Sequence, residues 1–155
     1  MIDYIELLYN TTELIKKYFA DKTDLGGSSY LYHLETVYKK MTTDKAKIVA
    51  LLHDILEDTN CTEEELSSIG CDDQIMEAIK AITRRSDEVN YSEYIIRVGE
   101  NEIAKTVKIA DLENNMDIRR LKSFGDREAK RLKKYFYSWK YLKGDITKEE
   151  YLSKF

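Results

Sequence analysis

Residues 48–59 read IVALLHDILEDT and are the most unusual segment of the chain, because a strongly apolar run here contains several ionisable residues. Its large aliphatic residues share one face of a helix that we expect to span residues 44–57. The stretch also carries four ionisable residues: His53, Asp54, Glu57 and Asp58. Val49 and Ala50 lie on the same side as these groups, so that side is not a simple solvated face. A buried carboxylate without a partner is costly, and we therefore expect something positively charged nearby.

The composition favours a single helical domain. A chain of 155 residues with 43% hydrophobic side chains is long enough for one core and too short for two ordinary domains. It has no proline and six glycines, whereas turn-dense β folds draw on both residue types. We predict an all-α fold, one domain over residues 1–155, and loops at 21–29 and 84–90. The expected helices cover residues 3–19, 29–41, 44–57, 63–69, 73–84, 92–100, 102–116, 126–142 and 148–154.

Charge and cysteine content limit the partners and the compartment. The net charge of −4 does not favour general binding to nucleic acid or to anionic membranes. No aliphatic run approaches the ~18 residues that a membrane span needs. Cys61 and Cys71 form neither a CxxC pair nor a disulfide framework. We expect a cytoplasmic protein with no membrane partner, and its oligomeric state stays open.

Helix starts and buried faces can be read from spacing. Thr62 with Glu65, and Thr147 with Glu150, have the spacing of a capping box. Apolar residues recur at helical spacing in two further segments, which we expect to face the core. These residues are Tyr30, Leu34, Val37 and Met41 in one segment, and Leu132, Phe136, Trp139 and Leu142 in the other.

Two further groups of residues are candidates for chemistry. His33 and His53 are the chain's two histidines, and each lies on a helix with an apolar stripe. A histidine in that setting is more often a hydrogen-bonded structural residue than a metal ligand. Lys108, Asp111 and Asn115 are spaced to share one helical face, which by itself is also typical of a solvated surface. From the residues alone, both interpretations remain open.

The order of these residues resembles a known family. A histidine, a tandem His-Asp and a distant aspartate are the signature of the HD-domain metal-dependent phosphohydrolases. The chain is similar in particular to the hydrolase domain of the Rel/SpoT stringent-response enzymes and their stand-alone relatives, over residues 22–142. Four blocks carry the resemblance: Tyr30-x-x-His33, ALLHDILEDT at 50–59, Thr83-Arg84, and KIADLENNMD at 108–117. It implies a single HD-type helical domain.

The resemblance also implies a metal site and a reaction. One divalent cation would be held by His33, His53, Asp54 and Asp111. Mixed nitrogen and oxygen ligands suit Mn²⁺, with Fe²⁺, Mg²⁺ or another divalent transition metal as alternatives. Such an ion acidifies a water molecule and polarises a phosphoryl oxygen, which predicts hydrolysis of a small phosphorylated nucleotide. The leading substrate is the 3′-pyrophosphate of (p)ppGpp-like nucleotides.

The same resemblance suggests roles around the metal. Glu57 and Asp58 match the family's acidic pair, and we assign them to positioning or deprotonating the attacking water. The alternative interpretation of Glu57 and Asp58 is a structural one, in which they form an acidic cluster at the helix end that a neighbouring basic residue holds in place. The predicted substrate contacts are Asn115, Lys108, Arg84 and Tyr30, although the basic members could form structural ion pairs only.

The chain departs from the family pattern at four positions. Asp24 and Leu25 stand where relatives carry basic residues, Ser29 replaces a proline, and Ile118 replaces a threonine. Recognition of a guanine base is therefore open. Alternatives are an HD-type hydrolase of another nucleotide or phosphorylated metabolite, and a nucleotide-binding HD protein without turnover.

A different class of function could reside in the last long helix. Residues 126–143 interleave lysine and arginine with aromatic residues, as a single-stranded nucleic-acid platform does. Because we expect Phe136 and Trp139 to face the core, an ordinary solvated lysine face explains the pattern better. Nucleic acid is therefore an unlikely partner.

Overall fold

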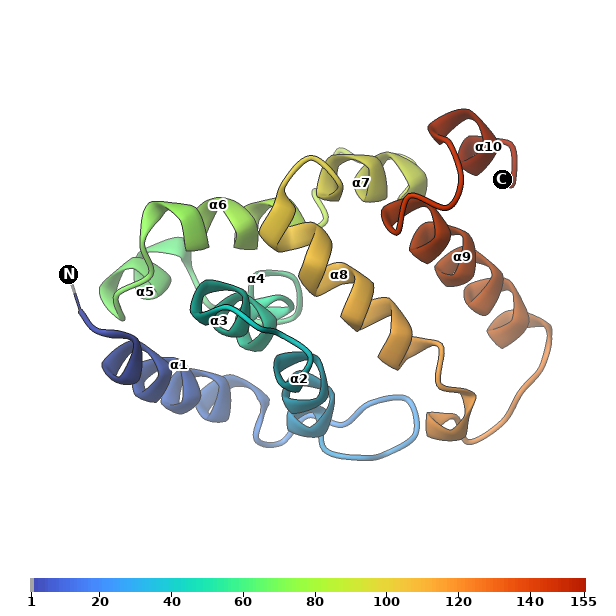
Figure 1. Cartoon of the computed structure of the whole chain (residues 1–155). Helices are drawn as coiled ribbons and strands as arrows, with labels where there is room; N and C mark the ends of the chain where they lie inside the picture. The colour runs from blue at the N-terminus through green and yellow to red at the C-terminus, as the bar shows by residue number, and fades with distance from the viewer. Residues whose placement is uncertain (1) are drawn as a thin grey trace.

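The computed structural model describes residues 2–155, and every regular element among them is a helix (Figure 1). One isolated β-bridge joins Thr23 to Ser29. The all-α prediction is confirmed. The elements in chain order are α1 (Tyr4–Phe19), α2 (Tyr30–Lys39), α3 (Asp44–Leu52), α4 (Ile55–Asp58), α5 (Glu63–Ser68), α6 (Asp73–Ile82), α7 (Tyr91–Val98), α8 (Glu102–Asn115), η1 (Ile118–Arg120), α9 (Asp126–Leu142) and α10 (Lys148–Leu152).

Helix α3 is the centre of the molecule. It packs against α1, α2, α6 and α8, and Figure 1 shows it between these helices. Ile48, Val49, Ala50 and Leu52 have no exposed surface. The expectation that the side with Val49 and Ala50 is not a simple solvated face is therefore confirmed, although Asp44 at the start of the helix is exposed.

The helix predicted over residues 44–57 is interrupted at its chemically important pair. It ends at Leu52, His53 and Asp54 form a turn, and α4 begins at Ile55. Asp54 has φ −104° and ψ −2°, which lies in the bridge region between helix and strand. Successive side chains on a continuous helix diverge by about 100°. In this turn, the Nε2 atom of His53 lies 3.0 Å from Oδ2 of Asp54, so the break lets two adjacent residues face one point.

The other predicted helices agree with the observed bounds to within two residues at each end. Thr62 and Glu65 form the predicted capping box at the start of α5. Thr147 accepts a hydrogen bond from the amide of Glu150 at the start of α10. The short helix η1 was not predicted.

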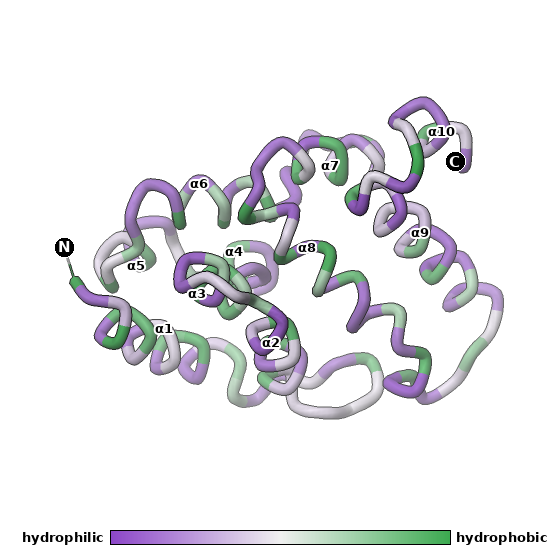
Figure 2. The backbone as a smooth tube through the Cα atoms, viewed as in Figure 1, coloured by the Kyte–Doolittle hydropathy of each residue, from purple (hydrophilic) through white to green (hydrophobic). Residues whose placement is uncertain are grey.

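The second predicted apolar stripe, on α9, faces the core only in part. Leu142 is buried, but Phe136 is 41% exposed, and the indole of Trp139 donates a hydrogen bond to Glu113. The buried side of α9 instead includes Ser138, whose hydroxyl bonds that of Tyr151 in α10. Figure 2 shows hydrophilic segments interrupting the hydrophobic ones along this helix. The expectation for Phe136 fails because α9 is rotated so that Ser138 meets α10.

The helices formed by residues 2–155 include none with the length and hydropathy needed to cross a membrane.

Candidate metal and phosphate site

Four side chains from three parts of the chain meet at one point. The candidate ligand atoms of His33, His53, Asp54 and Asp111 all lie within 4.8 Å of one another. His33 comes from α2, Asp111 from α8, and the His-Asp pair from the turn between α3 and α4. The structure therefore brings together all four residues predicted as metal ligands. We call these residues the His–Asp group.

The nitrogen and oxygen atoms of the His–Asp group approach one another closely. Nε2 of His33 is 3.0 Å from Oδ1 of Asp111 and 3.8 Å from Oδ2 of Asp54. Nε2 of His53 is 3.2 Å from the same Asp111 oxygen. Both histidines and Asp111 are buried. Two carboxylates so close together in a buried setting repel each other unless a positive charge lies between them.

Both histidines are held in the orientation that a metal requires. Nδ1 of His33 lies 2.7 Å from Oδ1 of Asn114, and Nδ1 of His53 lies 2.6 Å from the carbonyl oxygen of Ala50. These oxygens accept, so each Nδ1 donates, and Nε2 is the ring atom of each histidine that faces the site. Metal-binding histidines usually have such a partner on the second ring nitrogen. The donor set thus fits a divalent cation.

Charges around the His–Asp group shift several pKa values. Burial alone would lower the pKa of His53, but Asp54 and Asp111 raise it well above its usual value. Burial would raise the pKa of Asp111, but Lys108 and His53 hold it well below its usual value. The ammonium of Lys108 donates to Oδ2 of Asp111 at 2.8 Å and is itself buried. In the protein alone, Lys108 and His53 therefore supply the positive charge that a metal would otherwise bring.

Two of the predicted substrate contacts also touch the His–Asp group. The hydroxyl of Tyr30 donates to Asp54, and burial followed by the Asp54 charge raises the pKa of Tyr30. The amide of Asn115 donates to Oδ1 of Asp111 at 3.0 Å. Tyr30 and Asn115 also line a cavity of about 250 Å³, which none of the four residues of the His–Asp group lines. Tyr30 and Asn115 are therefore the residues that connect this cavity with the His–Asp group.

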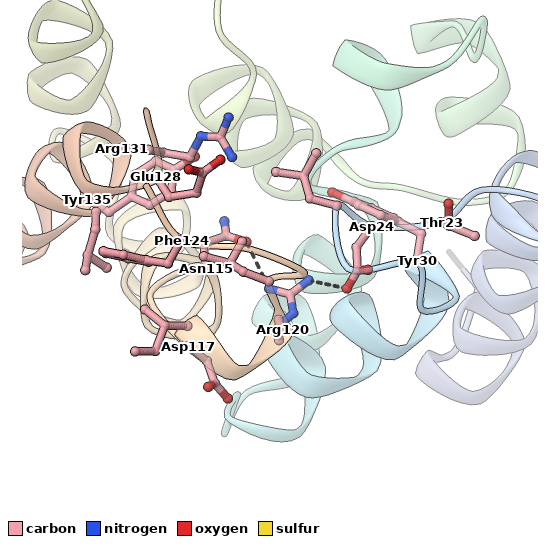
Figure 3. Close-up of a pocket in the computed structure, with 14 residues that line it drawn as sticks. Thr23, Asp24, Tyr30, Asn115, Asp117, Arg120, Phe124, Glu128, Arg131 and Tyr135 are labelled. Carbon is pink, nitrogen blue, oxygen red and sulfur yellow. Dashed lines mark hydrogen bonds and ion pairs between the residues drawn. The ribbon is translucent and has the colours of Figure 1, made fainter. Parts of the chain in front are cut away.

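An ion pair forms part of the cavity wall. Nη2 of Arg120 is 3.0 Å from Oδ2 of Asp24, and its Nη1 donates to Oδ1 of Asn115 (Figure 3). This pair joins η1 to the loop before α2. The sequence analysis did not predict the roles of Arg120 and Asn114. Asn114 could have been found from its position three residues after Asp111 on one helix, whereas nothing in the sequence pointed to Arg120.

Exposed apolar residues surround the same cavity. Leu25 is 66% exposed, Ile118 53% and Phe124 56%, and all three line it. Arg131 and Tyr135 of α9 complete the wall (Figure 3). Three of the four positions that depart from the family pattern, Asp24, Leu25 and Ile118, thus line this cavity.

The predicted acidic pair lies beside the His–Asp group on α4. Burial, followed by the charges of Asp54 and Glu57, raises the pKa of Asp58 to about 6. Burial also raises the pKa of Glu57, against a hydrogen bond from the backbone amide of Arg84 at 2.6 Å. As whole residues, Glu57 and Asp58 are nevertheless exposed. The side chain of Arg84 does not line the cavity but lies against the ring of Tyr91.

Comparison with solved structures identifies the fold. One similar chain is described as a metazoan ortholog of SpoT that hydrolyses ppGpp and plays a role in starvation responses. The TM-score is 0.69 at 17% identity, and the match covers 92% of this chain and 87% of the other. The chain has an HD-type helical fold. No protein-family model and no curated protein matches the sequence. The predicted fold class and its resemblance are confirmed, and the identity is too low to carry the substrate across.

Proposed function

We propose that the chain is a metal-dependent phosphohydrolase that acts on the 3′-pyrophosphate of (p)ppGpp-like nucleotides, as one HD domain over residues 1–155. The observation that carries the proposal is the convergence of His33, His53, Asp54 and Asp111 within 4.8 Å. The ppGpp hydrolysis described for a protein of the same fold supports the substrate class.

The His–Asp group would hold one divalent cation, with Mn²⁺ as our first choice and Fe²⁺ or Mg²⁺ as alternatives. Two neutral imidazoles and two carboxylates balance a charge of +2, and their mixed nitrogen and oxygen donors suit these ions. When bound, the ion supplies an acidified water and polarises a phosphoryl oxygen. Asn114 and the Ala50 carbonyl keep the two rings aimed at that ion.

The neighbouring residues orient the reactants. Glu57 and Asp58 would position the attacking water and take its proton, and a pKa of about 6 suits Asp58 to that role near neutral pH. Tyr30 holds the Asp54 carboxylate, while Asn115 keeps its second amide hydrogen free for a ligand in the cavity. A direct contact of Lys108 with substrate stays a prediction, since its ammonium donates to Asp111.

The second candidate is hydrolysis of another phosphorylated nucleotide or metabolite. The observation that favours it is the apolar cavity rim, where Leu25 and Ile118 replace polar residues of the family pattern. A cationic side chain that could stack on a base is absent at position 25. A base held by Leu25 and Phe124 would be selected by shape more than by charge.

A substrate screen with manganese tests both candidates. Release of pyrophosphate from a 3′-diphosphorylated guanosine supports the first, and release of orthophosphate from other nucleotides supports the second. Absence of turnover with every substrate, despite bound metal, would instead indicate a binding protein.

Two substitutions test the assigned roles. Asp54→Ala should lose both the bound metal, counted by elemental analysis, and the activity; Glu57→Ala should keep the metal and lose rate. Asp73→Ala, an exposed carboxylate on α6, is the matched control and should change neither. Normal metal-dependent turnover by Asp54→Ala would contradict the proposal.

A further inference from the structure

An apolar groove lies between α1 and α2, and it shares no residue with the cavity that Tyr30 and Asn115 line. Its volume is about 320 Å³, and α3 contributes one residue to it. Figure 1 shows α1 at the edge of the molecule. Apolar side chains form most of the groove: Leu8, Ile15, Leu31, Tyr38 and Leu51. Nothing in the proposed reaction uses this groove.

Two protruding apolar side chains lie next to the groove on α1. Ile5 is 78% exposed and Tyr9 is 66% exposed. Leu8 and Thr12, which line the groove, each follow one of these residues by three positions, so all four are neighbours on the helix surface. We call these four residues and the groove the α1–α2 patch. An apolar ridge beside an apolar groove is self-complementary, because the ridge of each copy can enter the groove of the other.

The polar side chains at the groove already have partners. The hydroxyl of Thr12 donates to the backbone carbonyl four residues earlier at 2.8 Å. Lys16 lies 3.2 Å from Glu13, and Glu35 lies 2.7 Å from Lys39. A polar ligand would have to replace these contacts, whereas an apolar side chain displaces only water from the groove. The groove therefore suits an apolar side chain better than a polar ligand.

The charges of α1 favour a second copy of this helix that runs in the opposite direction. Asp3 caps the helix, and Glu6 lies in its first turn. Lys16 and Lys17 lie in its last turn. In an antiparallel pair, the acidic start of each helix faces the basic end of the other, and the twofold axis forms this contact twice. A parallel pair would instead bring like charges together.

We propose that two copies of this chain associate through the α1–α2 patch, with antiparallel α1 helices and with Ile5 and Tyr9 of each copy in the groove of the other. The inference does not depend on the proposed function, because no patch residue belongs to the His–Asp group or lines the neighbouring cavity. With 16 residues, α1 is about 24 Å long. A contact of this length lies at the small end of specific interfaces, so we expect a dissociation constant on the order of micromolar.

The two helices of the patch also support the candidate site. Helix α2 carries His33 among its buried residues. At the end of α1, the ring of Phe19 stacks on that of Tyr30 with 5.2 Å between the ring centres. Association through the outer side of α1 and α2 therefore braces both helices and leaves the cavity residues free.

The mass of the protein in solution tests the proposal. Light scattering after size-exclusion chromatography, from about 1 to 200 µM protein, should show the mass rise from that of one chain towards that of two. The double variant Ile5→Glu, Tyr9→Glu should weaken association at least about tenfold, since it would bury charges in the groove of the other copy. Both positions are exposed, so circular dichroism should show an unchanged helical fold.

The matched control is the double variant Val89→Glu, Phe136→Glu. It places the same charges at two exposed apolar positions outside α1 and α2, and it should associate as the unaltered protein does. Equal weakening by both double variants, or the mass of a single chain at every concentration, would overturn the proposal. A monomer that binds an apolar dye, and loses the dye when Ile5 and Tyr9 are replaced, would assign the groove to an apolar small ligand instead.

Charge reversal tests the antiparallel arrangement. Glu6→Lys and Lys16→Glu should each weaken association about two- to fivefold, and a chain with both changes should recover most of the loss. These residues are ten positions apart, about 15 Å along the helix, so they do not pair within one chain. Recovery would therefore come from contacts between copies. Additive weakening in the chain with both changes would contradict the antiparallel dimer.

Discussion

Replacing Lys108 by methionine tests whether the His–Asp group is built for a cation. The Lys108 ammonium donates to Asp111 at 2.8 Å, and the two residues are 9% and 2% exposed. Methionine keeps an unbranched, flexible side chain that can still pack on Tyr94, while it removes the charge. In the metal-free protein, the variant therefore leaves the Asp111 carboxylate buried with less compensation.

The expected loss is large. Removal of one partner of a buried ion pair costs about 3–5 kcal/mol. For a chain of 155 residues, each kcal/mol lowers Tm by roughly 2–4 °C. We therefore expect the metal-free Lys108→Met protein to melt roughly 6–20 °C below the unaltered one, on the same principles.

Metal should reverse part of this loss. A divalent ion at the His–Asp group neutralises Asp111, and in the variant it no longer meets the repulsion of Lys108. The gain in Tm on adding manganese should therefore be larger for Lys108→Met than for the unaltered protein. Differential scanning calorimetry with chelator and with manganese measures both gains.

The matched control is Lys105→Met, which removes an ion pair with the exposed Glu102 on the same helix. Its stability should change by no more than about 0.5 kcal/mol, with or without metal. An equal loss in Lys108→Met under both conditions would refute the idea that Lys108 stands in for a metal charge. A metal-free loss no larger than that of the control would refute the buried ion pair itself.

Three further changes have defined outcomes. Asn114→Ala removes the hydrogen-bond partner of the His33 ring and should weaken metal affinity about 10–100-fold. Competition with a chromogenic chelator measures this affinity, and an unchanged value would show that the ring needs no partner. Gly26→Ala places a Cβ 1.9 Å from a backbone carbonyl oxygen of η1, so the loop must move; calorimetry should show a loss of about 1–3 kcal/mol, and an unchanged Tm would contradict this packing. Hydrogen bonds to its carboxylate, above all the one from Tyr18, lower the pKa of Glu65 from 4.5 to about 2. The contribution of this carboxylate to the free energy of unfolding is therefore present above pH 4.5 and lost as the pH falls towards 2. Urea titrations of Glu65→Gln should therefore show a stability deficit at pH 6 that shrinks in acid, and a deficit independent of pH would contradict it.

The helical layout was predictable because its signals are local. The spacing of Thr62 and Glu65 fixes the start of α5, and apolar recurrence placed the long helices to within two residues. The break at His53 and Asp54 was not predictable, since an uninterrupted apolar run gives no local sign of it. At the end of α3, the ring of His53 donates a hydrogen bond to the carbonyl oxygen of Ala50. Residue spacing alone does not reveal this contact, because a continuous helix would have the same spacing.

Sequence separation also explains which parts of the site could be found. Lys108 and Asn115 contact Asp111 from the same helix, so their spacing already placed them on its face. The hydrogen bonds from Tyr30 to Asp54 and from His33 to Asn114 join residues that are 24 and 81 positions apart, so no helical periodicity predicts them.

One part of the cavity wall is also formed by a contact between residues far apart in the sequence. Asp24 and Arg120 are 96 residues apart, and neither belongs to a helix longer than one turn. Asp24 was noted only as a lost basic residue, yet its carboxylate also accepts from the amides of Gly26 and Ser28. Asp24, which departs from the family pattern, thus holds its own loop and Arg120 in place at the cavity. Under the proposed function, selectivity for a nucleoside would therefore depend on the loop and η1 together, while the His–Asp group depends on α2, α8 and the turn between α3 and α4. Substitutions at Arg120 should consequently change which nucleoside is accepted, measured as kcat/KM across bases, before they change whether metal is bound.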